Sequence, residues 1–246
     1  MFSGCNNITE IIFSNFDTSK VENMEYMFYD CSSLVSLNLS NFDTSQVTSM
    51  QHIFHDCTSL ISLDLSNFKS SKVENMESMF EYCSALISLD LSNFDTSQVT
   101  TMMSMFEFCS ALISLNLSNF DTSSVEDMDF IFGYCSSLIS LNLSNFYTPK
   151  IKNTNSMFYN SFNLEYINLY NFKENSLTQF NDMFEGVPIN VVICINENNI
   201  ENLIQELSNL DCCVFDCSDN WKSNQLKIIN NTKECIISCD QNQNSF

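Results

Sequence analysis

One segment of this chain is repeated almost unchanged along most of its length. The stretch LISLDLSNFDTSQVTTMMSMFEFC (86–109) is followed by LISLNLSNFDTSSVEDMDFIFGYC (112–135). Seven units, from 5–30 to 161–186, share this period of 26 residues. A fixed period of about 20 to 50 residues indicates a solenoid, whose units bury their apolar faces only by stacking on one another. We call residues at equivalent places in successive units a column.

Each unit contains one segment with the spacing of a strand. In the stretch 60–68, Leu63 and Leu65 alternate with polar residues. Strict alternation of this kind predicts a half-buried β-strand. Because the units stack in register, the strands are expected to lie parallel on one face of the solenoid.

Each unit also contains an apolar stripe with helical spacing. Residues 45–57 place Val47, Ile53 and Cys57 on one side of a helix, and Thr44 or Ser45 is suited to cap it. The sequence therefore predicts an α/β solenoid: a curved, leucine-rich-repeat-like stack of seven 26-residue units, each a strand plus a short helix.

The repeat resembles a known family. LDLSNFDTSxVxxMxxMFxxC is similar to the 26-residue repeat of bacterial surface proteins, the BspA-like leucine-rich-repeat family. The similarity spans roughly residues 1–186, and the first and seventh units depart most from it. The resemblance implies a cell-surface or secreted protein that acts in adhesion, without enzymatic activity and without catalytic residues to transfer.

The ends of the chain are expected to differ from the repeats. We predict the solenoid at 1–186, a C-terminal cap of one strand and one helix at 187–210, and a cysteine-rich tail at 211–246. Met1 matches the interior of a repeat, and the first ten residues do not have the pattern of a secretory signal. We therefore expect a fragment of a surface or secreted protein whose signal lies upstream; if Met1 is the true start, the expected location is cytoplasmic.

Charge excludes two classes of partner. Thirty acidic residues against nine basic ones give a formal net charge of −21. Such a surface repels the phosphates of nucleic acids and the head groups of anionic membranes. No apolar stretch approaches the roughly 18 residues of a membrane-spanning helix.

The sequence contains few motifs of catalytic, cofactor or metal sites. No phosphate-binding loop and no nucleophile elbow is present, so we expect neither an enzyme nor a cofactor. The two histidines, His52 and His55, lie three residues apart with Asp56 nearby, which is a possible metal-binding set. We interpret them instead as part of a solvated helix face and predict no metal site there.

Two kinds of cysteine are distinguished. The repeat cysteines at 5, 31, 57, 83, 109 and 135 are interpreted as small buried side chains and not as cross-links, because Ser161 and Val187 continue the same column. The tail cysteines are candidates for disulfides in an oxidising compartment, or for a zinc site of four thiolates in a reducing one. These candidates are Cys212, Cys213, Cys217, Cys235 and Cys239.

A column of asparagines is interpreted as structural. Its members are expected to satisfy backbone groups at the bend that follows each strand. They lie at 15, 41, 67, 93, 119, 145 and 171.

The exposed side of the predicted strands is the candidate binding surface. It is polar and regular, and solenoids commonly bind ligands through such a surface. Its candidate ligand-binding residues are Ser36, Asn38, Ser62, Asp64, Ser88, Asp90, Ser114, Asn116, Ser140 and Asn142, joined at the end by Tyr166 and Asn168. N-glycosylation sequons begin at Asn7, Asn38, Asn116, Asn142 and Asn230.

The predicted function is recognition of a protein or carbohydrate ligand at a cell surface or matrix. Affinity would arise from many modest contacts added over successive repeats. The alternative is an intracellular scaffold that uses the same fold to bind partner proteins. Disulfides would favour the first location, and free thiols or zinc in the tail the second.

Overall fold

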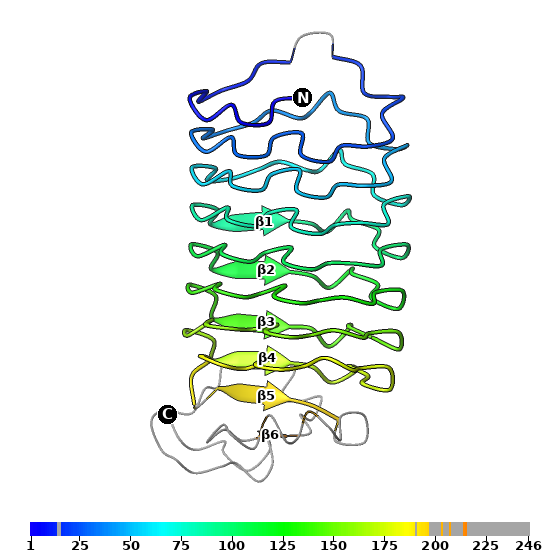
Figure 1. The fold of residues 1–246 in the computed structure, drawn as a ribbon, viewed down its shortest axis with the longest axis vertical. Coiled ribbons are helices and arrows are strands. Elements are labelled where there is room, and N and C mark those ends of the chain that lie inside the picture. The colour runs from blue at the N-terminus through cyan, green and yellow to red at the C-terminus, as the bar shows by residue number, and fades with distance from the viewer. Residues whose placement is uncertain (14–15, 190, 197–202, 204–206, 208–213, 216–246) are drawn as a thin grey trace.

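The chain winds into a stack of similar coils, one per repeat. The computed structural model describes residues 1–13, 16–189, 191–196, 203, 207 and 214–215. Within these residues the coils follow one another along the long axis of the molecule, with the N-terminus at one end (Figure 1).

Parallel strands run along one side of the stack, as predicted. They are β1 (Ser88–Asp90), β2 (Ser114–Asn116), β3 (Ser140–Asn142), β4 (Tyr166–Asn168), β5 (Val192–Cys194) and β6 (Val214–Phe215). β1 pairs with β2, and a second sheet has the order β3-β4-β5-β6. Paired residues in these sheets are 26 positions apart up to β5: Ser88 lies opposite Ser114, and Tyr166 lies opposite Val192.

Earlier coils continue this ladder without regular strands. The backbone N–H of Ile87 donates to the carbonyl of Ile61 at 3.2 Å, and Ile61 donates to Val35 at 3.5 Å. The opposite side of the coil carries a second ladder of parallel bridges, which joins one residue of each coil to the next. Its members are Asn23, Ser49, Asn75, Thr101, Asp127, Asn153 and Gln179.

The prediction of a short helix in each repeat is wrong. In the repeats, the segment 50–57 and its equivalents form successive turns, which we call the turn segment. Ile53 N–H donates to Met50 at 3.2 Å, and Cys57 N–H donates to Phe54 at 3.2 Å. His52 and Asp56, with φ of 54° and 58°, take the third position of these turns, where a type II turn requires positive φ.

The spacing of the coils explains why turns replace the helix. His52 N–H donates to Glu77 at 2.9 Å and Phe54 N–H to Met79 at 3.1 Å, so alternate amides bond to the next coil. Coils joined in this way are about 4.8 Å apart, whereas an α-helix with its side chains is about 10 Å wide. A helix in every coil would force this side apart and curve the stack. With ladders on both sides the stack is straight and not the curved rod expected (Figure 1).

Aromatic rings fill the centre of each coil in register. The ring of Phe54 is stacked 5.6 Å from Phe28 and 5.7 Å from Phe80, measured between centroids. The series continues through Phe106, Phe132 and Phe158 with nearly parallel rings. Because each ring is fully buried by the rings above and below, every coil must place the same residue there.

The thiols of the cysteine column are free, and all of its cysteines except the half-buried Cys5 are buried, which confirms its structural interpretation. Each buried thiol also makes a specific contact, as Cys57 Sγ does when it donates to the carbonyl of Phe28 at 3.3 Å. In the same column the Ser161 hydroxyl donates to Phe132 at 2.7 Å, so a serine performs the same role. Burial raises the pKa of Cys57 to about 12, which keeps the thiol protonated as a donor.

A ladder of buried hydroxyls was not predicted. Thr96 Oγ1 donates to the carbonyl of Asp121 at 2.9 Å and accepts the Asp121 N–H at 2.8 Å. Thr44, expected to cap a helix, binds the backbone of Lys69 in the same way. The column comprises Thr18, Thr44, Ser70, Thr96, Thr122 and Thr148, each buried, and one hydroxyl therefore satisfies two backbone groups of the next coil.

The asparagine column also performs its predicted structural role. Asn67 Nδ2 donates to the carbonyl of Ser40 at 3.0 Å. Asn93 Nδ2 donates to Phe68 at 2.8 Å and Asn145 Nδ2 to Phe120 at 2.8 Å. From Asn67 to Asn171 each amide of the column therefore joins its own bend to the preceding coil, whereas Asn15 lies outside the described residues.

The C-terminal end of the solenoid is covered in part by residues that the structure describes. β5 extends the parallel sheet beyond the last predicted repeat. Leu203 and Leu207 are helical and buried, and Leu203 N–H donates to the Glu174 carboxylate at 3.1 Å. The tail cysteines Cys212, Cys213, Cys217, Cys235 and Cys239, with the sequon at Asn230, lie outside the described residues.

The hydroxyl ladder yields a stability prediction. Thr96→Val keeps the shape of the side chain but leaves the Asp121 N–H and carbonyl without their partner, so we expect a loss of about 1–3 kcal/mol in the free energy of unfolding. Thr96→Ser should change it by less than about 0.5 kcal/mol, because Ser70 naturally occupies this column. Chemical denaturation followed by circular dichroism measures both, and equal stability of the two variants would contradict the role of the hydroxyl.

Candidate functional site

The predicted polar surface lies open on the strand side of the stack. The structure places Ser36, Asn38, Ser62, Asp64, Ser88, Asp90, Ser114, Asn116, Ser140 and Asn142 there, all exposed. The interleaved leucines, such as Leu63 and Leu89, are buried beneath them. Alternation along each coil therefore separates the core from a flat surface, as the sequence predicted, and ligand binding by these residues stays a prediction.

The side chains of one polar column are fixed by local hydrogen bonds. Asp64 Oδ1 accepts the backbone N–H of Ser66 at 2.9 Å, and Asp90 Oδ1 accepts that of Ser92 at 2.9 Å. Hydrogen bonds from the Ser66 side chain and backbone lower the pKa of Asp64, so its carboxylate is ionised at neutral pH. Asn38 makes the equivalent contact with Ser40 at 3.0 Å. These side chains are held in place before any ligand arrives.

An exposed apolar column adjoins the polar ones, and sequence reasoning missed it. Its members precede the exposed serines by one residue and are 43–50% exposed. The signal was available, since a β-branched residue recurs here with the same period. We define the strand face as the exposed polar residues from Ser36 to Asn142 together with Val35, Ile61, Ile87, Ile113 and Ile139.

The two predicted members in β4 are less exposed than the others. Asn168 is only 1% exposed, and its Oδ1 accepts the Tyr170 N–H at 3.0 Å. Tyr166 is half-buried. Both residues lie in β4, opposite Ser140 and Asn142 of β3, and the prediction of an exposed position is wrong for Asn168.

Several sequons coincide with the strand face. Asn38, Asn116 and Asn142 are exposed there, and Asn7 is exposed in the first coil. A glycan on any of the first three would cover part of the face.

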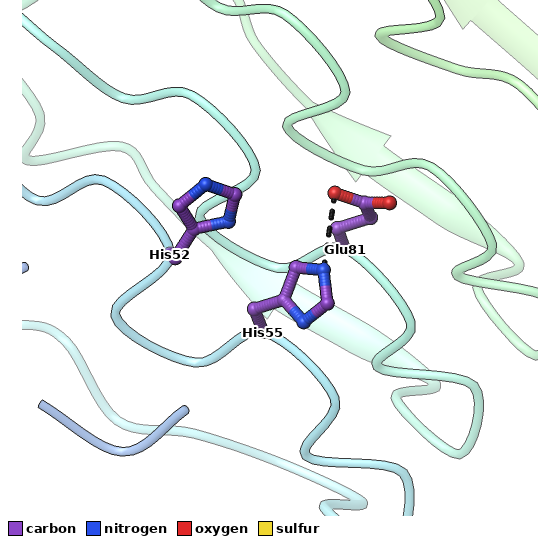
Figure 2. A group of neighbouring side chains, drawn as sticks. All are labelled: His52, His55 and Glu81. Carbon is purple, nitrogen blue, oxygen red and sulfur yellow. Dashed lines mark ion pairs between the residues drawn. The ribbon is translucent and has the colours of Figure 1, made fainter. Parts of the chain in front are cut away.

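The histidines lie elsewhere, on the turn segment, and not on a solvated helix face. His55 is 9% exposed, and the ring of Tyr29 stacks on it at a centroid distance of 4.7 Å. His52, His55 and Glu81 each offer a ligand atom, and these atoms lie within 4.8 Å of one another (Figure 2). The third member is Glu81 and not the adjacent Asp56 that the sequence suggested.

Glu81 could have been found from the period alone, since it follows His55 by 26 residues and occupies the next place in its column. Burial alone would raise the pKa of Glu81, but hydrogen bonds from His55 and Ser78 outweigh it and lower the pKa. Burial and the neighbouring His55 lower the pKa of His52. The group therefore combines an ionised carboxylate with a His52 ring that is neutral at neutral pH.

The comparisons with known proteins place this solenoid in a family. A family described as "Mycoplasma protein of unknown function, DUF285" matches residues 1–112 and 85–192. The chain belongs to this family. The matched part of this DUF285 chain comprises all seven repeats and ends at Val192, the first residue of β5. No protein with curated annotation matches it significantly.

A solved structure supports the assignment of the fold. The crystal structure of a leucine-rich repeat protein from Bacteroides ovatus matches with a TM-score of 0.52 at 18% sequence identity. The match covers 87% of this DUF285 chain and 56% of the solved one, so the chain spans little more than half of that protein. The fold is thus leucine-rich-repeat-like. Among the described residues, the structure has no helix long and apolar enough to cross a membrane.

Glu107 is the next member of the His55 and Glu81 column, and its protonation generates a pH prediction. Burial raises its pKa to about 7, with added repulsion from Glu81 and Asp129 and opposing contributions from Ser104 and His55. An unfolded glutamate titrates near pH 4.3, so between roughly pH 4.3 and 7 only the folded state holds the proton. Stability should therefore fall as pH rises through this window.

We expect Glu107→Gln, which imitates the protonated form, to unfold about 2–4 °C higher than the wild type at about pH 8, with the difference vanishing near pH 4. Thermal unfolding across this range measures the effect. The exposed Glu22→Gln serves as the control and should show no such trend. A constant difference between the Glu107 variant and the wild type at every pH would contradict the assignment.

Proposed function

We propose that this protein is a non-enzymatic binding module of a cell-surface or secreted adhesion protein, and that the strand face recognises its ligand. The observation that carries the proposal is the exposure of three columns in register over five coils: one of valine and isoleucine, one of serine, and one of asparagine and aspartate. Their repetition forms a continuous surface about 20 Å long.

The composition of this surface suits a protein or carbohydrate ligand. Ile61, Ile87 and Ile113 are each 47–50% exposed, and together they form an apolar stripe that a ligand could cover. Hydroxyl, amide and carboxylate groups border the stripe and can pair with polar groups of a ligand. Because each coil repeats the same contacts, an elongated ligand gains affinity from every further coil that it covers.

The resemblance to the BspA-like repeat supports location at the cell surface. The disulfide of Cys194 agrees with an oxidising compartment, since structural disulfides are rare in the cytoplasm. The proposed organisation is a solenoid at 1–186, a cap at 187–210 and a cysteine-rich tail at 211–246. The alternative is an intracellular scaffold, which would bind partner proteins through the same face.

A binding experiment tests the strand face. The purified chain is applied to an array of glycans and extracellular-matrix proteins, together with a variant carrying Ile61→Lys, Ile87→Lys and Ile113→Lys. We expect the wild type to bind at least one class of probe and the variant to bind it more than tenfold more weakly, because charges interrupt the apolar stripe.

A second variant controls for the added charge. Thr48→Lys, Gln98→Lys and Thr100→Lys add the same three charges at exposed positions away from the strand face and should leave binding within about twofold. Equal losses in both variants would show that net charge governs binding. Loss in the control variant alone would transfer the site to the other side of the coil.

The two locations differ in the state of the cysteines. We expect Cys194 to be disulfide-bonded in protein isolated from its native cells, whereas Cys31, Cys57 and Cys83 should be free and protected from a thiol reagent until the fold is denatured. Alkylation before and after denaturation, followed by mass spectrometry without reduction, measures both. A free Cys194 in the native protein would favour the intracellular scaffold.

A further inference from the structure

We propose that His52, His55 and Glu81 form a zinc-binding site that joins two neighbouring coils on the turn segment (Figure 2). Two imidazoles and one carboxylate are a ligand set that zinc accepts, and they leave one coordination position for water. The site is distinct from the strand face and does not depend on its proposed function.

The separations of the donor atoms suit a tetrahedral ion. His55 Nε2 lies 3.3 Å from Glu81 Oε2. Two ligand atoms at about 2.0–2.2 Å from zinc are separated by roughly 3.3–3.5 Å at the tetrahedral angle. The ligand atoms of the three residues lie within 4.8 Å of one another, so a shift of about 1 Å in the side chains brings the last donor into place.

The second nitrogen of each ring faces a further carboxylate. His52 Nε2 lies 3.8 Å from Glu77 Oε1, and His55 Nδ1 lies 3.3 Å from Asp56 Oδ2. Metal-binding histidines usually direct their other nitrogen to a carboxylate, which fixes the ring and strengthens it as a ligand. This arrangement assigns Nδ1 of His52 and Nε2 of His55 to the ion.

The buried nitrogens supply an independent reason for a ligand. Nδ1 of His52 and Nδ1 of His55 are buried without a hydrogen-bond partner. For His55 this holds although Asp56 lies nearby, because the contact lacks the alignment of a hydrogen bond. An unpaired buried polar atom costs free energy, and a metal on His52 would satisfy one of the two directly. His55 itself is 9% exposed.

Stacked rings limit the movement of both histidines. The ring of Tyr26 lies on His52 at a centroid distance of 4.8 Å, and Tyr29 lies on His55 at 4.7 Å. The two imidazoles are themselves 5.2 Å apart. The backbone of His52 is fixed as well, because its N–H donates to the carbonyl of Glu77 in the next coil at 2.9 Å. Such preorganisation lowers the cost of gathering the ligands around an ion.

Zinc titration of the full chain tests the proposal. Free exposed thiols are first blocked with iodoacetamide, so that the tail cysteines cannot bind the metal, and ZnCl₂ is then added in a calorimeter. We expect one equivalent to bind and the midpoint of thermal unfolding to rise with zinc. X-ray absorption of the bound zinc should show nitrogen and oxygen ligands without sulfur.

The repeat supplies variants that retain the fold. His52→Ser reproduces Ser78 and Ser104 of its own column, and His55→Tyr reproduces Tyr29 and Tyr159. Glu81→Gln removes the third ligand. Each should weaken zinc binding at least tenfold. Glu107→Gln makes the same change one coil further along the column and should retain binding within about threefold.

Each outcome decides the question. One zinc per chain that is lost in the three ligand variants and kept in Glu107→Gln supports the site. No binding by the wild type, equal binding by all variants, or sulfur among the ligands overturns it. If a ligand variant is unfolded by circular dichroism, the two that remain folded still give the comparison.

Discussion

Backbone hydrogen bonds between neighbouring coils are the interaction on which the rest of this structure depends. Parallel ladders run along both sides of the stack, and alternate amides of the turn segment also bond to the next coil. Each coil therefore satisfies its polar backbone through its neighbours, which requires coils of equal length in fixed register.

The same register determines what lies inside. A buried position is covered by its own equivalents above and below, so phenylalanine stacks on phenylalanine. Two of the polar columns in the interior bond across coils, as Thr96 does with Asp121 and Cys57 with Phe28. Two substitutions in these columns retain the bond, because the hydroxyls of Ser70 and Ser161 donate to the neighbouring coil as the threonines and cysteines of their columns do.

Function is proposed at two places that use the repeat in opposite ways. The strand face is long because the repeats are alike: each coil adds a valine or isoleucine, a serine, and an asparagine or aspartate to one surface. The proposed zinc site depends on a difference between repeats, since His52 and His55 occur in one coil only and lie close to Glu81 of the next coil. Stacking at strand spacing makes both possible, because it brings residues 26 positions apart into contact.

The sequence by itself determined the period, the parallel strands, the buried cysteine column and the asparagine ladder, because each is a property that one repeat shares with the next. It failed for the stretch 45–57, where apolar residues at helical spacing lie on successive turns. The apolar pattern of one coil says nothing about the distance between neighbouring coils. That distance is too short for a helix in every coil. The tertiary structure alone therefore decided between helix and turn and buried Asn168. The period of the sequence already contained the column of Ile87 and the meeting of Glu81 with His55, although the predictions missed both.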